Sequence, residues 1–214
     1  MNFRVVVGWV AGTATVIASS TGFPQGGFRG DPAKALPIVE QVCAACHGKD
    51  GVGTAPVNPN LAGQHPEYML RQLVSFRPQA GKPPERGNAV MVGMVAGLKE
   101  DDLPHLAAYY ATQKPAVRAA RDPELARRGQ AIYRGGILSK GVAACAACHA
   151  PNGAGVPAQF PRIAGQHAEY TESQLRAFRS GERTTDPNRM MRAIAAKLSD
   201  VEIRAVAEYI AGLR

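Results

Sequence analysis

The sequence is poor in aromatic residues, in cysteine and, beyond its N-terminus, in long uncharged apolar runs. Aromatic side chains make up 6% of its 214 residues, and Trp9 is its one tryptophan. Because large aromatic side chains supply much of the buried area of most cores, this chain needs another bulky group to fill its interior. Apolar residues at 45% and charged residues at 20% are close to globular averages, which excludes wholesale disorder and a collagen-like fibre. The four cysteines are the residues to which such a group would attach.

Acidic residues are outnumbered, 17 against 25 Lys and Arg, which gives a formal net charge of +8. Nucleic-acid binding is disfavoured, because Arg127-Arg128 is the only adjacent basic pair and no nucleic-acid-binding motif is present. The excess is uneven: residues 23–118 hold 10 basic and 8 acidic side chains, a net +2, whereas residues 119–214 hold 14 and 9, a net +5. This distribution predicts that the second half docks on an acidic protein partner.

Residues 1–22 contain no Asp or Glu and have the layout of a secretory signal peptide. Arg4 precedes an apolar stretch of about 14 residues, which is shorter than the roughly 20 residues that span a bilayer. Extension of this stretch to Phe23 just reaches that length, so an uncleaved membrane anchor stays open as the alternative. The sequence predicts an exported protein, with any membrane association peripheral or through this segment.

A repeat organises the rest of the chain. Val-Cys-Ala-Ala-Cys-His at residues 42–47 recurs as Ala-Cys-Ala-Ala-Cys-His at residues 144–149, displaced by 102, and the segment Ala-Gly-Gln-His recurs at the same displacement. The displacement falls to 100 near the end of each copy, because the first copy has two extra residues in the loop after Arg77. Two homologous domains explain this pattern. The expected division is an N-terminal domain at 23–114, a linker at 115–121 and a C-terminal domain at 122–214.

Each copy is predicted to be helical. Asp31-Pro32 and Asp122-Pro123 are matched helix starts, since Asp caps free amides and Pro suits the first helical position. The run from Ser199 to Glu202 is a capping box, and apolar residues follow it at spacings of three and four. No convincing alternating strand pattern is present. The predicted fold class is all-α.

The cysteines form two Cys-x-x-Cys-His motifs, made of Cys43, Cys46 and His47, and of Cys145, Cys148 and His149. This is the attachment sequence for c-type haem. The spacing suits the chemistry, because both thiols must reach the two vinyl groups of one porphyrin and the adjacent His is carried to the iron. Two disulfides, a zinc site and a thioredoxin-like redox pair are weaker alternatives. A zinc site usually has about 15–20 residues between its Cys pairs, and a thioredoxin-like pair belongs to an α/β pattern that this chain lacks. Two covalently bound haem c groups are the expected cofactors.

A second axial ligand for each iron can be sought by matching the copies. Only Met91 and Met191 align with each other among the methionines that follow the signal segment, 44 and 42 residues after the respective His. A thioether sulfur in this position gives the His/Met ligation of electron-carrying cytochromes. Met69, Met94 and Met190 have no matched methionine, and we expect them to be packing residues.

Other matched residues leave alternatives open. His65 and His167 form a pair that would make the sites bis-His, although a locally hydrogen-bonded His is the simpler interpretation. The matched polar residues are expected to bond haem propionates or to meet across the domain interface; they are Gln64 and Gln166, Tyr68 and Tyr170, and Arg77 and Arg179. A carbonyl of Pro56 and Pro157, or of Pro59 and Pro161, is expected to orient each axial His ring.

With these motifs the chain resembles the dihaem cytochrome c4 family. The resemblance rests on the two Cys-Ala-Ala-Cys-His motifs, two Ala-Gly-Gln-His-x-Glu-Tyr segments and the residues from Met191 to Asp200, and it covers essentially the whole mature sequence. It implies two class I cytochrome c domains related by a pseudo-twofold axis, with haems that exchange electrons across the interface. It also implies a periplasmic carrier whose usual partner is a respiratory oxidase, and axial ligation by His47, Met91, His149 and Met191.

The predicted function is an electron carrier between respiratory complexes and a terminal oxidase, and not an enzyme in itself. The alternative is the electron-accepting dihaem subunit of an oxidoreductase, such as a flavocytochrome c sulfide dehydrogenase. A dihaem peroxidase is a weaker third hypothesis, because it needs an open or displaceable iron position, which Met91 and Met191 argue against.

Overall fold

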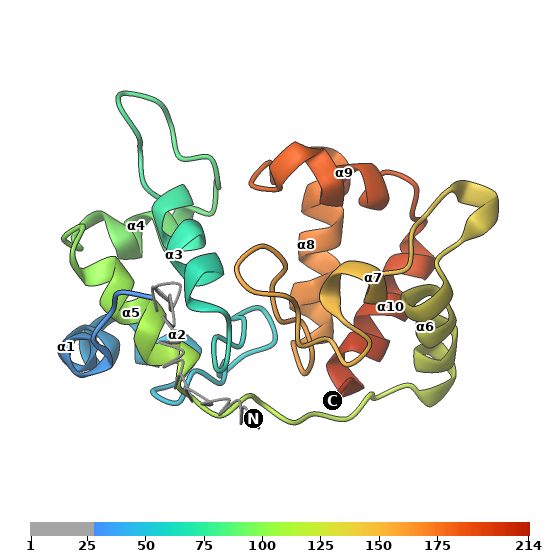
Figure 1. The fold of residues 1–214 in the computed structure, drawn as a ribbon, viewed down its shortest axis with the longest axis horizontal. Helices are drawn as coiled ribbons and strands as arrows, with labels where there is room; N and C mark the ends of the chain where they lie inside the picture. Colours follow the sequence, from blue (N-terminus) through green and yellow to red (C-terminus); the bar gives the residue numbers. More distant parts are fainter. Residues whose placement is uncertain (1–27) are drawn as a thin grey trace, which may run out of the picture.

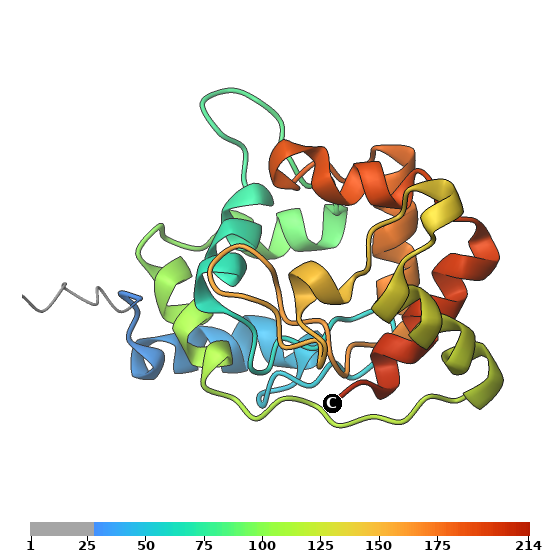
Figure 2. The same ribbon diagram turned by 45° about the vertical axis from the view of Figure 1, so that its right-hand side comes forward.

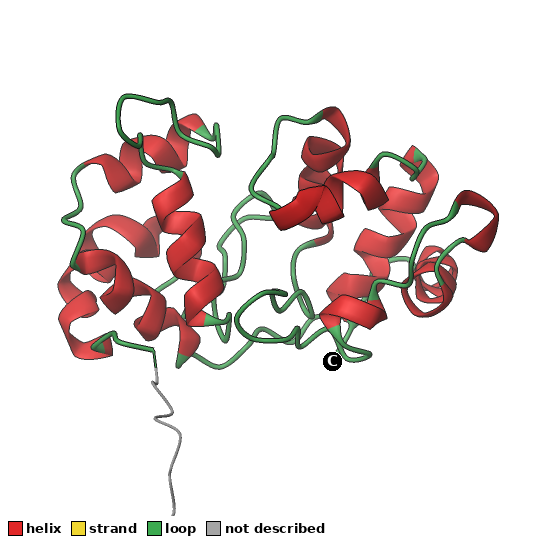
Figure 3. Cartoon of the chain, turned by 45° about the horizontal axis from the view of Figure 1, so that its top comes forward, coloured by secondary structure: helices red, strands yellow, loops and turns green. Residues whose placement is uncertain are grey.

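The computed structural model describes residues 28–214. The predicted signal segment lies outside the described residues. Helices and loops account for the described chain, in which β-pairing is limited to isolated bridges (Figure 3). Within the described part, no helix is long and apolar enough to cross a bilayer. The all-α prediction is confirmed.

From residue 28 onward, the first half is built from five α-helices and one π-helical turn. They are α1 (Pro32–Ile38), the turn η1 (Val39–Cys43), α2 (Ala44–His47), α3 (Pro66–Ser75), α4 (Ala89–Ala96) and α5 (Asp102–Ala111). Asp31 caps α1 as expected, with its side chain accepting from the amide of Ala33. Helices α1 and α3 both pack on α5, whose Leu103, Leu106 and Tyr110 are almost fully buried.

The second half repeats this plan with different local structure. Its elements are α6 (Pro123–Gly135), the 3-10 turn η2 (Leu138–Lys140), α7 (Ala146–His149), α8 (Ala168–Ser180), the 3-10 turn η3 (Pro187–Arg189), α9 (Met190–Ala195) and α10 (Asp200–Gly212). Helices α6 and α8 pack on α10. Gly129 of α6 makes the first contact possible, because a Cβ there would lie 1.9 Å from the carbonyl oxygen of Ala205. The predicted capping box of α10, Ser199 with Glu202, is present.

The two halves form two lobes that stand side by side, each with its last helix at the core (Figure 1). Residues 114–120 have no regular secondary structure and run along one edge of the molecule from the first lobe to the second (Figure 2). Two of the hydrogen bonds that cross between the lobes form a reciprocal pair. Asn60 N donates to Gln166 Oε1 and Arg162 N donates to Gln64 Oε1, both at 2.9 Å. Because Asn60 and Arg162 are matched positions, this reciprocity is the mark of a pseudo-twofold relation.

Candidate functional site

One cavity of about 960 Å³ runs between the lobes and is lined by residues of both. All eight predicted haem-binding residues line it: Cys43, Cys46, His47, Met91, Cys145, Cys148, His149 and Met191. The fold therefore brings the two Cys-x-x-Cys-His motifs and the two matched methionines to a single interior space. None of the four cysteines, which all lie in the described part, is in a disulfide.

Each axial His candidate is fixed by the carbonyl of a matched proline. His47 Nδ1 lies 2.9 Å from the carbonyl oxygen of Pro59, and His149 Nδ1 lies 3.0 Å from that of Pro161. A carbonyl only accepts, so Nδ1 must carry the proton and the lone pair lies on Nε2, the atom that a metal binds. Of the two proline pairs suggested by the sequence, Pro59 and Pro161 are the ones that do this.

Burial keeps both imidazoles in the form that ligates a metal. His47 and His149 are each 8% exposed, and desolvation lowers the pKa of both, against the opposing effect of the proline carbonyls. The neutral ring with a free Nε2 is the state that binds iron. Desolvation also raises the pKa of the Cys43 thiol, and it raises the pKa of Cys145 to about 11, so neither thiol is poised as a reactive thiolate. Attachment chemistry therefore fits these cysteines better than a redox role.

The two methionines lie at the beginning of equivalent helices, α4 and α9, but are positioned by different devices. In the first lobe, Asn88 caps α4 and accepts from the amide of Met91 at 2.9 Å. In the second lobe, the buried carboxylate of Asp186 accepts from the amide of Arg192 at 2.9 Å and from its Nε at 2.8 Å. Both devices fix the backbone beside the methionine, so that each side chain faces the cavity.

The other methionines differ partly from expectation. Met69 is a buried member of the first lobe's core, as predicted for a packing residue. Met94 and Met190, also expected to pack, are not part of the protein core in the described residues: both line the cavity, from α4 and α9, and are 47% and 37% exposed.

The matched histidines do not join the site. His167 lies outside the haem cavity. Its Nε2 is 3.1 Å from Arg118 Nη2 of the linker and 3.3 Å from the carbonyl oxygen of Gly53 in the first lobe. Neither His65 nor His167 lines the haem cavity. The geometry therefore gives no support to bis-His ligation, and the expectation of a locally hydrogen-bonded His is wrong for His167, whose ring contacts the linker and the opposite lobe.

Two of the three matched polar pairs meet across the lobes, and the third does not. Gln64 and Gln166 each hold a backbone segment of the opposite lobe, through the bonds described above and through Nε2 donation to the carbonyls of Arg162 and Asn60. Arg179 instead donates to the carbonyl of Leu198 and to Asp200 within its own lobe. The expectation for Arg179 is wrong, because its position on α8 directs it to the beginning of α10.

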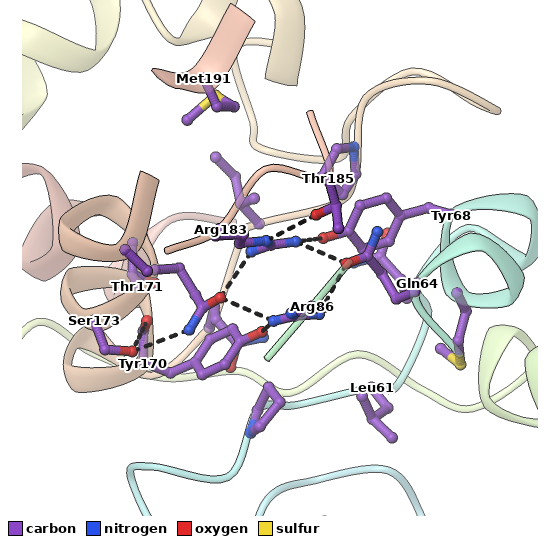
Figure 4. A pocket seen from close by; sticks show the side chains of 18 of the residues that line it. Leu61, Gln64, Tyr68, Arg86, Tyr170, Thr171, Ser173, Arg183, Thr185 and Met191 are labelled. Carbon is purple, nitrogen blue, oxygen red and sulfur yellow. Dashed lines mark hydrogen bonds between the residues drawn. The ribbon is translucent and has the colours of Figure 1, made fainter. Parts of the chain in front are cut away.

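Sequence matching missed the arginines that contact the tyrosine pair, Tyr68 and Tyr170, across the lobes. Arg183 Nη2 donates to Tyr68 Oη at 2.9 Å, and Arg86 Nη2 donates to Tyr170 Oη at 2.8 Å (Figure 4). They escaped detection because they are displaced by 97, in loops of unequal length. The signal that identifies them is a repeated Glu-Arg dipeptide, at 85–86 and 182–183.

The cavity fits a large apolar group that carries acidic substituents. Its wall contains aliphatic and aromatic side chains from both lobes together with four arginines, Arg71, Arg86, Arg162 and Arg183. Arg162 Nε is buried without a hydrogen-bond partner, and desolvation lowers the pKa of its guanidinium. Within residues 28–214, none of the four forms a salt bridge with a carboxylate. Porphyrins with ionised propionates supply both the apolar surface and the missing negative charge.

Comparison with known proteins agrees with this arrangement. The Cytochrome c family profile matches residues 33–114 and 126–214, one copy for each lobe. Cytochrome c4 of Azotobacter vinelandii is 49% identical over 178 residues, which cover 80% of this chain and 84% of that protein. The crystal structure of reduced recombinant cytochrome c4 from Pseudomonas stutzeri superposes with a TM-score of 0.81 at 46% identity, covering 86% of this chain and all of that one. The chain belongs to the dihaem cytochrome c4 family.

A second kind of relative matches over most of the chain as well. A thiosulfate dehydrogenase electron acceptor of Thiomonas intermedia is 37% identical over 180 residues, which cover 83% of this chain and 81% of that protein. Membership of the cytochrome c4 family establishes an electron-transfer protein that binds two haem c groups covalently, and that is not an enzyme in itself.

Proposed function

We propose that this protein is a periplasmic electron carrier that delivers electrons from respiratory complexes to a terminal oxidase. Its proposed haem ligands are Cys43, Cys46, His47 and Met91 in an N-terminal domain at 23–114, and Cys145, Cys148, His149 and Met191 in a C-terminal domain at 122–214. A linker at 115–121 joins them, and residues 1–22 direct export. The observation that carries the proposal is the convergence of both complete ligand sets on one cavity.

The haem iron supplies one-electron chemistry between its Fe(III) and Fe(II) states. The proposed ligands His47, Met91, His149 and Met191 would hold the two irons: each His is oriented by a proline carbonyl, and each Met is held at the beginning of its helix by Asn88 or by the Asp186–Arg192 contact. Two protein ligands on each iron would leave no site for a substrate on the metal, which favours electron transfer over oxygen or peroxide chemistry.

The helices that carry the methionines differ in charge, which supports an acidic partner at the second domain. Helix α4 has no charged residue, whereas α9 contains Arg192 and is flanked by the exposed cations Arg189 and Lys197. In the described part of the chain, Arg189 and Lys197 form no salt bridge. Uncompensated charge beside a haem cavity raises the rate of encounter with an acidic surface.

A second candidate function is the electron-accepting subunit of a sulfur-compound oxidoreductase, of which a flavocytochrome c sulfide dehydrogenase is one type. The similarity to the Thiomonas intermedia electron acceptor favours this class over other enzyme complexes. The two candidates share all eight haem ligands, so the partner decides between them. Reduction of the purified protein by a thiosulfate or sulfide dehydrogenase, at a rate that exceeds reduction by a quinol-oxidising complex, would establish the second function.

The spectrum of the oxidised protein tests the ligand proposal. We expect low-spin haem with a band at about 695 nm, the region of Met–Fe(III) charge transfer, in an amount that matches two haems for each chain. High-spin haem, or binding of carbon monoxide by the native reduced protein, would overturn the carrier with two closed irons. The mass of the protein recovered from the periplasm reports separately on residues 1–22, since removal of the signal segment lowers it by the mass of that segment.

A separate experiment tests whether Arg189 and Lys197 contribute to the docking surface. Arg189 and Lys197 are replaced together by Glu, and oxidation of the reduced protein by anionic ferricyanide is followed at rising ionic strength. We expect the unmodified protein to react several-fold more slowly at high salt, and the double variant to lose most of this dependence. The matched change on the uncharged helix, Ala89→Lys, is expected to increase the salt dependence. An unchanged dependence in the double variant would show that these two cations do not form the docking surface.

A further inference from the structure

Arg86 and Arg183 are joined into one network by two glutamines. Gln72 Oε1 accepts from Arg86 Nη1 at 2.8 Å and from Arg183 Nη2 at 2.9 Å. Gln174 Oε1 accepts from Arg86 Nη2 and from Arg183 Nη1, both at 2.8 Å. Together with the tyrosine contacts, every one of these acceptors is bonded to the guanidinium of the opposite lobe (Figure 4). The two cations therefore form one unit that belongs equally to both domains.

Several contacts fix this unit in place. The backbones of Arg86 and Arg183 form an isolated antiparallel bridge across the interface. Each guanidinium also stacks on an aromatic ring of its own lobe, Arg86 on Phe76 at 4.6 Å and Arg183 on Phe178 at 4.5 Å to the ring centroid. The rings and the amide oxygens leave the guanidiniums little freedom to turn toward bulk solvent. The pair is therefore built to present charge at one point of the cavity.

Arg86 and Arg183 carry two positive charges, and neither guanidinium is bonded to a carboxylate in the described part of the chain. Arg183 is 6% exposed, and the acceptors bonded to the two guanidiniums are the neutral oxygens of Gln, Tyr and Thr side chains. Asp186, the buried carboxylate of the cavity wall, is engaged by Arg192. Arg86 is only half-buried, but two like charges that share acceptors, one of them buried, destabilise the fold unless an anion lies nearby. Tyr68 lies in the field of these cations: burial raises the pKa of its hydroxyl, but the charges of Arg183, Arg86 and Arg71 and the hydrogen bond from Arg183 together bring that pKa below its ordinary value.

We propose that Arg86 and Arg183 are a shared counter-charge for the carboxylates of both haems, so that each arginine sets the reduction potential of the haem in both domains. The inference rests on the proposed function, since it needs two ligated haems in the cavity. A fixed positive charge favours Fe(II) over Fe(III) in any haem that it reaches, and thereby raises the potential. Because the pair is bonded to both lobes, it raises the two potentials together.

The test is a redox titration in which NMR signals of the haem methyl groups follow each haem separately. Arg86→Gln and Arg183→Gln each remove one charge and keep a hydrogen-bonding side chain. Each change is expected to lower the reduction equilibrium constant of both haems by about tenfold, equivalent to about 59 mV for one electron. Arg71→Gln is the matched control, because Arg71 also lines the cavity but is exposed and contacts the opposite lobe only through the carbonyl of Gln159, at 3.3 Å. It is expected to shift the potentials much less.

The conservative variants Arg86→Lys and Arg183→Lys separate charge from structure. These variants keep the positive charge but lose the planar guanidinium group with its several donors. Reduction potentials near those of the unmodified protein are therefore expected. The proposal is overturned if each Gln variant shifts only the haem of its own domain, if the Lys variants shift the potentials as much as the Gln variants, or if Arg71→Gln has the same effect as Arg86→Gln. Failure of the proposed function is distinguishable, because it would be seen in the haem content and the 695 nm band of the unmodified protein.

Discussion

The two lobes present the same haem-binding residues on different local structure. In the first, η1 and α2 continue directly from α1, so that Cys43 and His47 lie at the end of one helical segment. In the second, α6 ends at Gly135, and a loop that contains η2 intervenes before α7. The porphyrin requires a fixed spacing of the two thiols and the imidazole. The segment that precedes each motif only has to place the motif at the cavity, so its structure can differ between the lobes. The comparison teaches that the ligand set is constrained by porphyrin geometry and the approach to it is free to diverge.

The largest expected effect comes from the two methionines. Met91→Ala and Met191→Ala should each remove about half of the 695 nm band and give one haem that binds carbon monoxide, because each opens one iron position. Absorption spectra of the oxidised protein, and of the reduced protein under carbon monoxide, measure this. Met94→Ala and Met190→Ala are the matched controls at the cavity rim, and both should keep the full band. Loss of the band in a control would mean that the ligand has been assigned to the wrong methionine.

The devices that position the methionines should differ in strength. Asp186→Asn leaves Arg192 beside a neutral partner in a poorly solvated place, and we expect it to destabilise the second lobe by about 2–3 kcal/mol. Asn88→Ala removes an ordinary helix cap and should destabilise the first lobe by about 1 kcal/mol. Guanidinium unfolding followed by the 695 nm band gives both values. Equal losses would show that the buried carboxylate contributes no more than a cap.

The last helices differ at their N-termini. Helix α10 has the complete capping box of Ser199 and Glu202, whereas α5 has a partial equivalent, in which the amide of Lys99 donates to Asp102 at 2.8 Å. Ser199→Ala is expected to lower the stability of the second lobe by about 1 kcal/mol. The change Lys99→Ser, which offers the first lobe a hydroxyl at the matched position, should raise its stability by a smaller amount. Thermal unfolding of the purified haem protein measures both changes.

The smallest expected effect is an acid-dependent contribution at Asp200. A hydrogen bond from Arg179 and the charges of Arg179 and Arg176 lower the pKa of this exposed carboxyl in the folded protein. Because the pKa of Asp200 is lower in the folded protein than in the unfolded chain, its ionised carboxylate stabilises the fold at pH values above the unfolded pKa of about 3.9. This stabilisation is lost as the pH falls below that pKa. The difference in melting temperature between the unmodified protein and Asp200→Asn should therefore shrink between pH 6 and pH 3 (roughly). Glu100→Gln, at the matched position in the first lobe, is the control. If the difference in melting temperature between the unmodified protein and Asp200→Asn grew on acidification, the expected direction of the pH dependence would be wrong.

Much of the fold was predictable because its signals are local. The caps at Asp31 and Asp122 and the capping box at Ser199 depend on residues close in sequence, which act before any tertiary contact forms. The eight proposed haem-binding residues could be named for a related reason. A repeated chain shows its shared chemistry as matched positions, so Met91 and Met191 could be separated from three other methionines without a structure.

What escaped prediction depends on side chains that lie far apart in sequence. Arg86 and Arg183 lie in loops whose lengths differ, so the repeat loses its register where they occur. Arg179 could not be distinguished from them by sequence, since all three are arginines near the matched helices, and only the packing of α8 against α10 directs Arg179 to Asp200. The exposure of Met94 and Met190 was not predicted for a similar reason. The burial of a side chain depends on the neighbours that the tertiary structure places around it and not only on its own hydrophobicity.

The sequence alone therefore determined the cofactor, the all-α class and the two-domain plan, and it supplied the proposed ligand set, because covalent attachment and helix signals are written in short motifs. Only the tertiary structure decided how the domains meet. It placed Pro59 and Pro161 on the histidines, tied Gln64 and Gln166 to the opposite backbone, and gathered the arginines into one cavity. The physical reason is that a buried charge or amide takes its partners from whatever surrounds it, and those surroundings exist only when both lobes have folded and docked.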